Sequence, residues 1–313
     1  MDMKKSLTIL VPTFNEEQNL NECVSVISRL QNSIEKELGI SVEVSFLDNH
    51  STDNTFELLK SACRNNNSWT AIRLIRNYGV QASLLKGMAV ASTDGLLVYQ
   101  SDLQDPPEIA FKLAEEWLKG GRVIAGIASK RAEKWMDRTT RKIFYSILKN
   151  SSDFGLTPWF HDFYLLDKVV YKSLFRQGFE HEFIRGRISE EFGIDKSISY
   201  TRNIRTEGVS SFNFARKYSM ALDGILRYGN RFSRIVSMGS LFLSLFTLLS
   251  AIILLLTWIF GIRSPSQGWL SLFFANLFLL TLSSFSLSLS SEFFFRILRL
   301  SGSKLAPEIE EQC

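Results

Sequence analysis

Acidic and amide side chains follow the apolar run GLLV, at the point where a strand is expected to end. In the stretch YQSDLQDPPE, these side chains are Asp102 and Gln104. Carboxylate and amide oxygens suit Mg²⁺ or Mn²⁺ ions that bridge phosphates. The stretch therefore has two interpretations: it is either a metal and diphosphate site or a simple turn from a strand into a helix.

The second half of this stretch has the signature of a helix start. Asp105 fits the N-cap, Pro106 the first helical position and Glu108 the reciprocal position of a capping box. Helix initiation accounts for these three residues. It does not account for Asp102 or Gln104, which precede the helix and carry the hypothesis of a metal site.

Polar side chains also mark the ends of the other expected strands. Asn15 and Glu16 follow the first strand, Asp48 ends the second, and Arg76 and Asn77 end the third. The carboxyl ends of parallel strands meet at one edge of a sheet, where ligands bind in open α/β folds. We therefore expect these side chains to surround one ligand.

The run LDNHSTDNT has a structural and a functional interpretation. Ser51 or Thr52 fits the cap of a helix that starts near Asp53, and His50 is interpreted as a turn residue rather than a ligand. Asp48, however, ends an apolar strand and is placed to accept hydrogen bonds from a base or a ribose.

Apolar, β-rich segments alternate with helical patterns along the first part of the chain. The helical spacing is clearest between Cys23 and Leu38, and further helices are expected near Asp53, over 80–91 and from Pro106. The expected strands are LTILVPTF, VEVSFLD, TAIRLIR, GLLVYQSD and RVIAGIAS. This alternation predicts an α/β domain with a mostly parallel sheet and helices on both faces.

Two apolar runs in the last third of the chain predict a transmembrane hairpin. From Ile235 to Ser291 the only charged residue is Arg263. Each run exceeds the roughly 20 residues that a spanning helix needs, and buried helices of soluble cores rarely run this long without a charge. Basic residues crowd both flanks of the hairpin, while its loop holds only Arg263, which places both ends in the cytoplasm.

We therefore expect a membrane protein of the cell (inner) membrane with five parts. They are a cytoplasmic α/β domain (1–210), juxtamembrane interfacial amphipathic helices (211–234), two transmembrane helices (235–262 and 268–291) and a cytoplasmic tail (292–313). The three cysteines have no paired spacing, which indicates a reducing compartment without a zinc site. The formal charge of +4 is largely juxtamembrane, which favours lipid contact over nucleic-acid binding.

These motifs together resemble one family. VPTFNEEQNL and LDNHSTDNT resemble the first two motifs of family 2 glycosyltransferases of the Rossmann-like GT-A fold, the second being Asp-Asp-Gly-Ser-x-Asp-x-Thr. RNYGVQASLLKG, YQSDLQDPPE, HDFYLLDK, FIRG, RTEGVSSFN and SEFFFRIL resemble motifs of its polyprenyl-phosphate branch, which includes bactoprenol glucosyltransferases and dolichol-phosphate mannose synthases. The resemblance covers nearly the whole chain.

The chain departs from the family pattern at several positions. Gln100 stands for the first Asp of the Asp-x-Asp signature, Asn49 and His50 for the second Asp and the Gly of the turn, and Ser211 for a Lys. The tail SGSKLAPEIEEQC replaces one rich in Arg and Pro. The missing carboxylate weakens the inference of a metal but leaves Asp102 and Gln104.

The resemblance implies an inverting transfer of a sugar from a nucleotide sugar, with UDP-glucose expected, to a polyprenyl phosphate, with undecaprenyl phosphate expected. It implies catalytic and Mg²⁺- or Mn²⁺-binding roles for Asp102 and Gln104, and a homo-oligomer. The implied nucleotide-sugar-binding residues are Pro12, Phe14, Glu16, Asp48, Ser51, Asp53, Arg76, Asn77, Gln100 and Ser101. The implied lipid-phosphate-binding residues are Arg131, Arg138, Arg205 and Ser210.

Three other functions remain open. One is a mannose synthase of the same branch that uses GDP-mannose. Another is a non-catalytic GT-A-like protein that binds lipid phosphate or nucleotide sugar, for which Gln100 is the main support. The third is a processive polysaccharide synthase, but the chain lacks the Gln-x-x-Arg-Trp motif and the additional spans of those enzymes.

Overall fold

The computed structural model describes residues 4–130, 160–176, 184–202 and 307–313, together with isolated positions between 249 and 297. The chain divides into two compact units. The first comprises Met1–Lys149, Phe154–Ala221 and Lys304–Cys313, and the second Asn150–Asp153 and Leu222–Ser303. The first unit holds all the strands described below.

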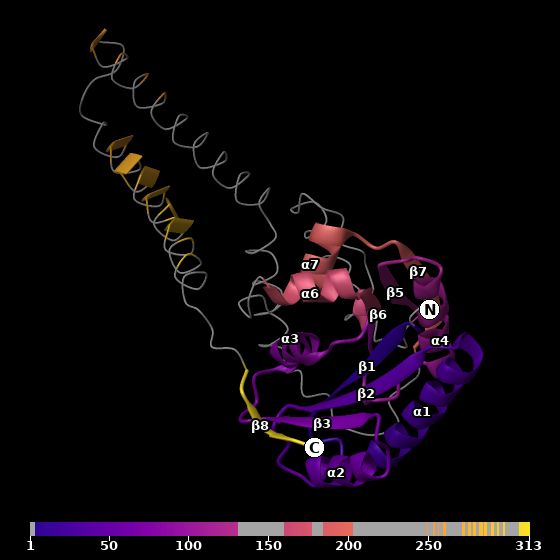
Figure 1. The fold of residues 1–313 in the computed structure, drawn as a ribbon. Coiled ribbons are helices and arrows are strands. Elements are labelled where there is room, and N and C mark those ends of the chain that lie inside the picture. The colour runs from indigo at the N-terminus through magenta and orange to yellow at the C-terminus, as the bar shows by residue number, and fades with distance from the viewer. Residues whose placement is uncertain are drawn as a thin grey trace. The chain divides into compact units, whose positions relative to one another are not determined.

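A mixed sheet of eight strands organises the first unit (Figure 1). Its order is β7-β5-β6-β4-β1-β2-β3-β8, and only β6 and β8 run antiparallel to their neighbours. The strands are β1 (Ser6–Thr13), β2 (Ser41–Asp48), β3 (Trp69–Leu74), β4 (Gly95–Val98), β5 (Val123–Lys130), β6 (Phe160–Asp167), β7 (Lys196–Thr201) and β8 (Ile309–Gln312).

Helices cover both faces of this sheet (Figure 1). One face carries α1 (Leu20–Ser33) with its π-helical extension η1 (Ile34–Leu38), α2 (Thr55–Arg64) and α4 (Pro107–Leu118). The other carries α3 (Val80–Val90), α6 (Lys168–Arg176), and α7 (Ile184–Arg187) with its extension η2 (Ile188–Phe192). The predicted α/β sheet with helices on both faces is therefore confirmed.

The central strands are apolar on both sides because each side meets a layer of helices. On β1, Ile9 packs into the core beneath α1, α2 and α4, while Leu10 packs into the core beneath α3, α6 and α7. Successive strand residues point to opposite faces, so a strand covered on both faces reads as one continuous apolar run. Gly87 lets α3 approach this strand, since a Cβ there would lie 2.6 Å from the Leu10 methyl groups.

All five expected strands form, and the sheet gains three that the sequence pattern did not predict, β6, β7 and β8. Cys23 and Cys63 are buried free thiols and Cys313 is an exposed one. Burial raises the pKa of Cys23 to about 12, so this thiol is a core group.

The juxtamembrane residues 211–234 lie outside the described residues, as does most of both expected spans, 235–262 and 268–291. Within the described part of the chain, no helix combines the length and the apolar composition that a membrane crossing needs.

Candidate functional site

Four adjacent parallel strands bring the expected donor residues to one edge of the sheet. The order β4-β1-β2-β3 places the loops after these strands side by side. Glu16 follows β1, Asp48 ends β2, Asn77 follows β3, and Asp102 lies in the loop after β4. Open α/β sheets bind ligands at this edge.

Asp48 is a fully buried carboxylate at the end of β2. Its oxygens accept hydrogen bonds from the Ser51 backbone N–H at 3.1 and 3.2 Å and from the Ser51 hydroxyl. Burial raises the pKa of Asp48, and the hydrogen bonds from Ser51 and the charge of Arg73 oppose that rise. The arrangement holds an acceptor of hydrogen bonds in a site sheltered from water.

The turn after β2 is interlocked with the loop after β1. The Asn15 N–H donates to Ser51 Oγ at 2.9 Å, and the Thr52 N–H donates to Asn15 Oδ1 at 2.8 Å. Farther along, the Glu16 N–H donates to Thr55 Oγ1 at 2.9 Å. Side chains of one loop thus satisfy backbone donors of the other, which fixes both loops against each other.

The expectation that Ser51 or Thr52 caps a helix is wrong. Helix α2 begins at Thr55, and its N-cap, Asn54, makes no side-chain capping bond. Ser51 instead holds Asp48 and the Asn15 amide, while Asp53 Oδ1 accepts the Thr55 N–H at 3.1 Å. A buried carboxylate three residues away is a stronger partner for the serine hydroxyl than a solvent-facing helix end.

His50 is a turn residue, as expected. It has a positive φ of 64°, a conformation that favours glycine, and its Nδ1 lies 3.0 Å from the Leu74 carbonyl oxygen. The family's glycine at this position is therefore replaced by a side chain that bridges the ends of β2 and β3.

Asn49 is a site residue that the sequence reasoning treated only as a departure from the family. It is buried, and its Nδ2 donates to Asn77 Oδ1 at 2.8 Å while its Oδ1 accepts the Tyr78 N–H at 2.9 Å. An aspartate could not make the first of these bonds, because an ionised carboxylate only accepts. Arg76 is exposed, and its guanidinium lies 4.7 Å from the Tyr78 ring centre.

The loop after β4 carries the two carboxylates of the Asp-Leu-Gln-Asp sequence. Asp102 is partly buried, with 21% of its side chain exposed, and its Oδ1 accepts the Gln104 N–H at 3.2 Å. Leu103 between them has a positive φ of 52°. This tight turn presents Asp102 and Gln104 on the same short segment, and Ser101 before them is buried.

The capping role expected of Asp105 is wrong. Helix α4 begins at Pro107 with Pro106 as its N-cap, and no side chain caps it. Neither Pro106 nor Pro107 has an N–H, so a capping carboxylate would find few donors there. Asp105 is instead fully buried and faces β7, where it accepts from the Tyr200 hydroxyl and from Arg202 Nε at 3.0 Å.

Arg202 joins the two carboxylates of this loop. Its Nε lies on Asp105, and its Nη2 lies 3.4 Å from Asp102 Oδ2. Burial raises the pKa of Asp105, while the positive charge of Arg202 and the Tyr200 hydroxyl oppose the rise. The sequence pattern does not show which carboxylates Arg202 contacts, because the pairing of β7 with β5 brings it to them.

Gln100 occupies the position where the family has its first aspartate. Its Nε2 donates to the Asp162 carbonyl oxygen on β6 at 3.0 Å. The Asp162 carboxylate in turn accepts from Gln81 at 3.1 Å and pairs with Arg185 at 3.3 Å. The amide therefore ties the end of β4 to β6, through a donor that a carboxylate lacks.

The residues present fit a divalent cation whose coordination shell is completed by oxygen atoms of a bound substrate. Asp102 and Gln104 offer oxygen atoms of the kind that Mg²⁺ and Mn²⁺ bind. Among the described residues, no group of three or more His, Cys, Asp or Glu side chains could hold a metal by itself. A cation at Asp102 would therefore need phosphate oxygens from a substrate, as is usual for Mg²⁺.

Two other sets of expected residues have different outcomes. Pro12 lies in β1 and Phe14 directly after it, with Phe14 41% exposed at the ligand edge. The residues expected to bind the lipid phosphate lie outside the described residues: Arg131, Arg138, Arg205 and Ser210.

Comparisons with known proteins agree with the motifs. The sequence model of Glycosyl transferase family 2 matches residues 8–175. A glycosyltransferase of Synechocystis sp. is 27% identical over 303 residues, which cover 94% of this chain and 92% of the relative. The bactoprenol glucosyl transferase of Shigella phage SfV is 26% identical over 293 residues, 93% of this chain and 94% of the relative.

Among solved structures, that of a mycobacterial protein matches with a TM-score of 0.51. The two sequences are 17% identical, and the match covers 74% of each chain. This likeness concerns the fold alone.

Proposed function

The chain belongs to glycosyl transferase family 2, and from this premise we propose that it transfers a hexose from a nucleotide sugar to a polyprenyl phosphate at the cytoplasmic face of the membrane. Its mixed α/β sheet is of the GT-A type. The expected donor is UDP-glucose and the expected acceptor undecaprenyl phosphate, because the similarity to a bactoprenol glucosyl transferase extends over nearly the whole of both chains.

The placement of two carboxylates carries the proposal. Asp48 ends β2 and Asp102 follows β4, and β1 alone separates these two strands in the sheet. Two strand spacings correspond to about 10 Å. This separation suits a ligand with a hydrogen-bonding nucleoside at one end and a diphosphate at the other, which is the form of a nucleotide sugar.

The nucleoside end of this site combines a buried acceptor with an exposed aromatic ring. Asp48 accepts an N–H of the base, and the Phe14 ring, which is 41% exposed, offers an apolar face beside it. Glu16 follows Phe14 on the same loop and completes the nucleoside end. The remaining residues expected to bind the donor lie on both sides of Asp48. Pro12 in β1 and Gln100 and Ser101 after β4 lie toward the diphosphate end, while Ser51 and Asp53 follow β2 and Arg76 and Asn77 follow β3.

At the diphosphate end, Asp102 and Gln104 are the residues that would hold Mg²⁺ or Mn²⁺. Such a cation would supply positive charge against the nucleoside diphosphate as it leaves. Arg202 lies next to Asp102 and adds positive charge at the same end. The side chains thus orient the diphosphate and shield it from water.

The acceptor removes the need for a strong general base. A phosphate monoester is already anionic near neutral pH, so its oxygen can attack the anomeric carbon without losing a proton to the protein. Catalysis then depends on alignment and on charge stabilisation. In-line attack inverts the anomeric centre, and an amide at Gln100 is compatible with this chemistry.

The acceptor and the membrane complete the proposal. Arg131, Arg138, Arg205 and Ser210 bind the lipid phosphate, since arginine suits bidentate phosphate contact. The apolar runs 235–262 and 268–291 anchor the enzyme, and residues 211–234 lie at the headgroups. The enzyme assembles as a homo-oligomer and serves the synthesis of a cell-envelope polysaccharide.

The test uses membranes that contain the full chain. They are incubated with undecaprenyl phosphate and labelled UDP-glucose or GDP-mannose, with and without a chelator, and are then extracted with organic solvent. We expect labelled lipid from UDP-glucose and its loss with the chelator. Labelled lipid from GDP-mannose alone would identify a mannose synthase instead. No labelled lipid from any nucleotide sugar would contradict the proposed transfer.

A further inference from the structure

The strand β8 reaches the donor edge from the other end of the sequence. It pairs antiparallel with β3, and backbone hydrogen bonds of 2.9 and 3.0 Å join Ala71 to Cys313 in both directions. In Figure 1, β8 closes the side of the sheet next to β3. Residues of the tail SGSKLAPEIEEQC, which differs from the family's tail, therefore lie near the end of β2 that carries Asp48.

An irregularity in this pairing aims one side chain at the site. Arg73 pairs with Glu311 and Leu74 with Ile309, so Glu310 is an extra residue on β8. A β-bulge of this kind bends a strand locally and redirects a side chain. Glu310 and Glu311 consequently reach different partners, although they are neighbours in sequence.

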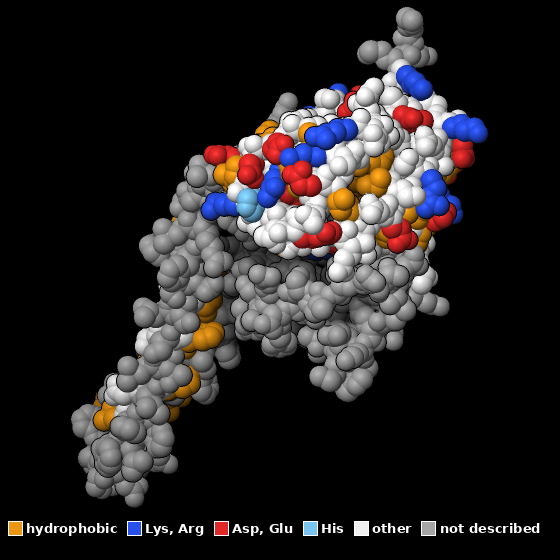
Figure 2. Space-filling view, turned by 90° about the horizontal axis from the view of Figure 1, so that it is seen from below, with side chains coloured by type: hydrophobic (Ala, Val, Ile, Leu, Met, Phe, Trp, Pro, Cys, Tyr) orange, Lys and Arg blue, Asp and Glu red, His pale blue; other side chains and the backbone are white. Residues whose placement is uncertain are grey.

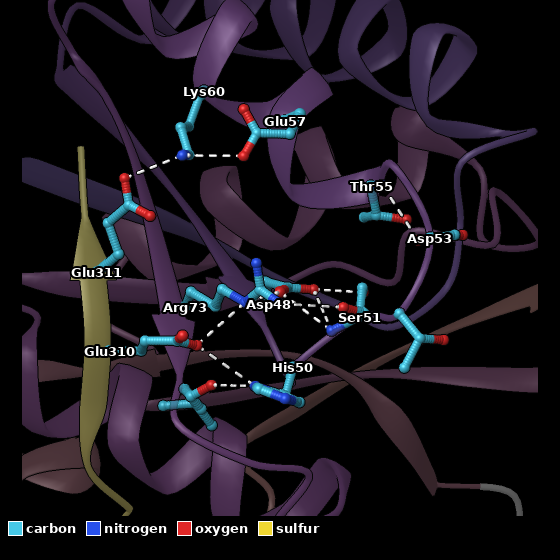
Figure 3. Close-up of polar contacts among 12 residues, drawn as sticks. Asp48, His50, Ser51, Asp53, Thr55, Glu57, Lys60, Arg73, Glu310 and Glu311 are labelled. Carbon is cyan, nitrogen blue, oxygen red and sulfur yellow. Dashed lines mark hydrogen bonds and ion pairs between the residues drawn. The ribbon is translucent and has the colours of Figure 1, made fainter.

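Glu310 joins the network around Asp48, as Figure 3 shows. Its Oε2 lies 3.2 Å from Arg73 Nε and 3.4 Å from His50 Nδ1. The same Arg73 Nε lies 3.7 Å from Asp48 Oδ2, and Arg73 Nη2 donates to the Ser51 carbonyl oxygen at 3.2 Å. One guanidinium is thus shared between the buried Asp48 and the partly exposed Glu310.

Glu311 meets a different group. Its Oε1 lies 3.0 Å from Lys60 Nζ on α2, and Lys60 also pairs with Glu57 at 2.9 Å. In Figure 3, Glu57, Lys60 and Glu311 lie apart from Asp48. Figure 2 shows acidic and basic side chains lying side by side on one face of the molecule. Glu311 lies opposite Arg73 in the strand pairing, but its carboxylate pairs with Lys60, whereas the Arg73 guanidinium pairs with Glu310. Because Glu311 has the same charge and lies on the same strand as Glu310, it is a matched control.

The shared guanidinium has a consequence for Asp48. At 3.7 Å, Arg73 Nε is beyond hydrogen-bond distance of Asp48 Oδ2 but close enough to stabilise its charge. Without a second carboxylate, the guanidinium would be drawn onto Asp48 and would occupy the oxygen that a ligand N–H needs. Glu310 keeps Arg73 at the intermediate position.

We propose that Glu310 is a positioning residue of the nucleoside site, which acts through Arg73 to keep Asp48 available to the base of the donor. This inference rests on the proposed nucleotide-sugar site. It assigns to the residues after 304 a part in donor binding, in addition to the strand that they contribute to the sheet.

The test compares Glu310→Gln with Glu311→Gln in the full-length protein in detergent. Calorimetry gives the dissociation constants of UDP and GDP, and the transfer assay gives kcat and the KM values of donor and acceptor. We expect Glu310→Gln to raise the UDP dissociation constant and the donor KM about fivefold, with the acceptor KM unchanged. Glu311→Gln leaves all these values within about twofold, as expected for an exposed pair.

A mutant cycle identifies the route of the effect. If Glu310 acts through Arg73, Glu310→Gln has no further effect on UDP binding in an Arg73→Gln background, because interacting residues are not additive. A merely structural role for β8 would lower the melting temperature equally in both glutamine variants and leave UDP binding unchanged.

The outcomes separate this inference from the proposed function. Equal UDP binding by Glu310→Gln and Glu311→Gln, or additive effects of Arg73→Gln and Glu310→Gln, would overturn the inference alone. A wild-type protein that binds neither UDP nor GDP would overturn the nucleotide site and the inference together.

Discussion

Two carboxylates are fully buried at the same edge of the sheet, Asp48 at the end of β2 and Asp105 in the segment after β4, but they are held in different ways. The hydrogen bonds that Asp48 accepts with its side chain come from Ser51, three residues away. Those of Asp105 come from Tyr200 and Arg202, which are 95 and 97 residues away. One side of the site is therefore built by a local turn, and the other depends on the assembly of the sheet as far as β7.

On the β4 side of the site, we expect the largest loss of activity from a substitution of Asp102. We expect Asp102→Asn to lower kcat/KM by roughly 1,000-fold, because it removes the charged ligand of the proposed cation and about 4 kcal/mol of transition-state stabilisation. The transfer assay with saturating acceptor measures this loss. Glu108→Gln, an exposed change in the first turn of α4, is the control and retains activity. Unchanged transfer in Asp102→Asn would refute the role assigned to this carboxylate.

Removal of Arg202 tests whether Asp105 depends on partners that are distant in sequence. Arg202→Gln leaves the buried Asp105 with Tyr200 as its remaining partner, and we expect a loss of about 3 kcal/mol in the free energy of unfolding. Thermal unfolding of the purified protein measures the change. Arg122→Gln is the control, since Arg122 is exposed and its pair with Asp195 spans 3.9 Å, which predicts a change of about 0.5 kcal/mol or less. Equal melting temperatures for the two variants would show that the buried Asp105 does not need the positive charge of Arg202.

The local side is tested at Ser51. Ser51→Ala removes a donor to Asp48 and the acceptor of the Asn15 N–H, and we expect a destabilisation of about 1 to 2 kcal/mol with a raised donor KM. Thr52→Ala is the matched control, because its backbone N–H still donates to Asn15 and its side chain is exposed. A Thr52→Ala protein as unstable as Ser51→Ala would contradict the special role of the serine hydroxyl.

The smallest effect concerns pH and Asp48. Burial raises its pKa in the folded protein, so its contribution to folding stability is fully present below the unfolded pKa and is lost as the pH rises through the folded pKa. In the proposed site, donor binding needs the ionised Asp48 carboxylate and therefore has the opposite pH dependence. UDP affinity should fall by about tenfold or less per pH unit below the raised pKa.

Titration of UDP binding against pH checks this expectation. Asp48→Asn has no carboxyl proton at this position, so its weaker binding should lack that pH dependence. The same pH profile in both proteins would assign the effect to another group.

Local patterns in the sequence predicted the central sheet and its ligand edge. The strand around LTILVPTF is an almost continuous buried run because both of its faces are covered, while VEVSFLD alternates buried and exposed residues before its buried end. Both patterns are recognisable without a partner. In β7, KSISYT has one fully buried residue, and in β8, IEEQ has none. These two strands form because an adjacent strand provides backbone hydrogen-bonding partners. The residues of β7 and β8 alone do not reveal that adjacent strand.

The same distinction explains the error at Asp105. The pattern DPPE has the composition of a helix start, and α4 does begin there. However, the Asp105 carboxylate does not form the capping box. It accepts hydrogen bonds from Tyr200 in β7 and from Arg202 directly after β7. Asn49 was undervalued for a similar reason, because its partner at Asn77 lies across the sheet edge.

The interlocked loops after β1 and β2 also determine what donor binding costs. The amides of Asn15, Glu16 and Thr52 already donate to side chains of the facing loop before any ligand is present. A loop that is ordered in advance loses little conformational entropy when a ligand arrives. The proposed nucleoside end of the site is therefore preorganised, and its affinity should depend mainly on the contacts made and little on ordering the chain.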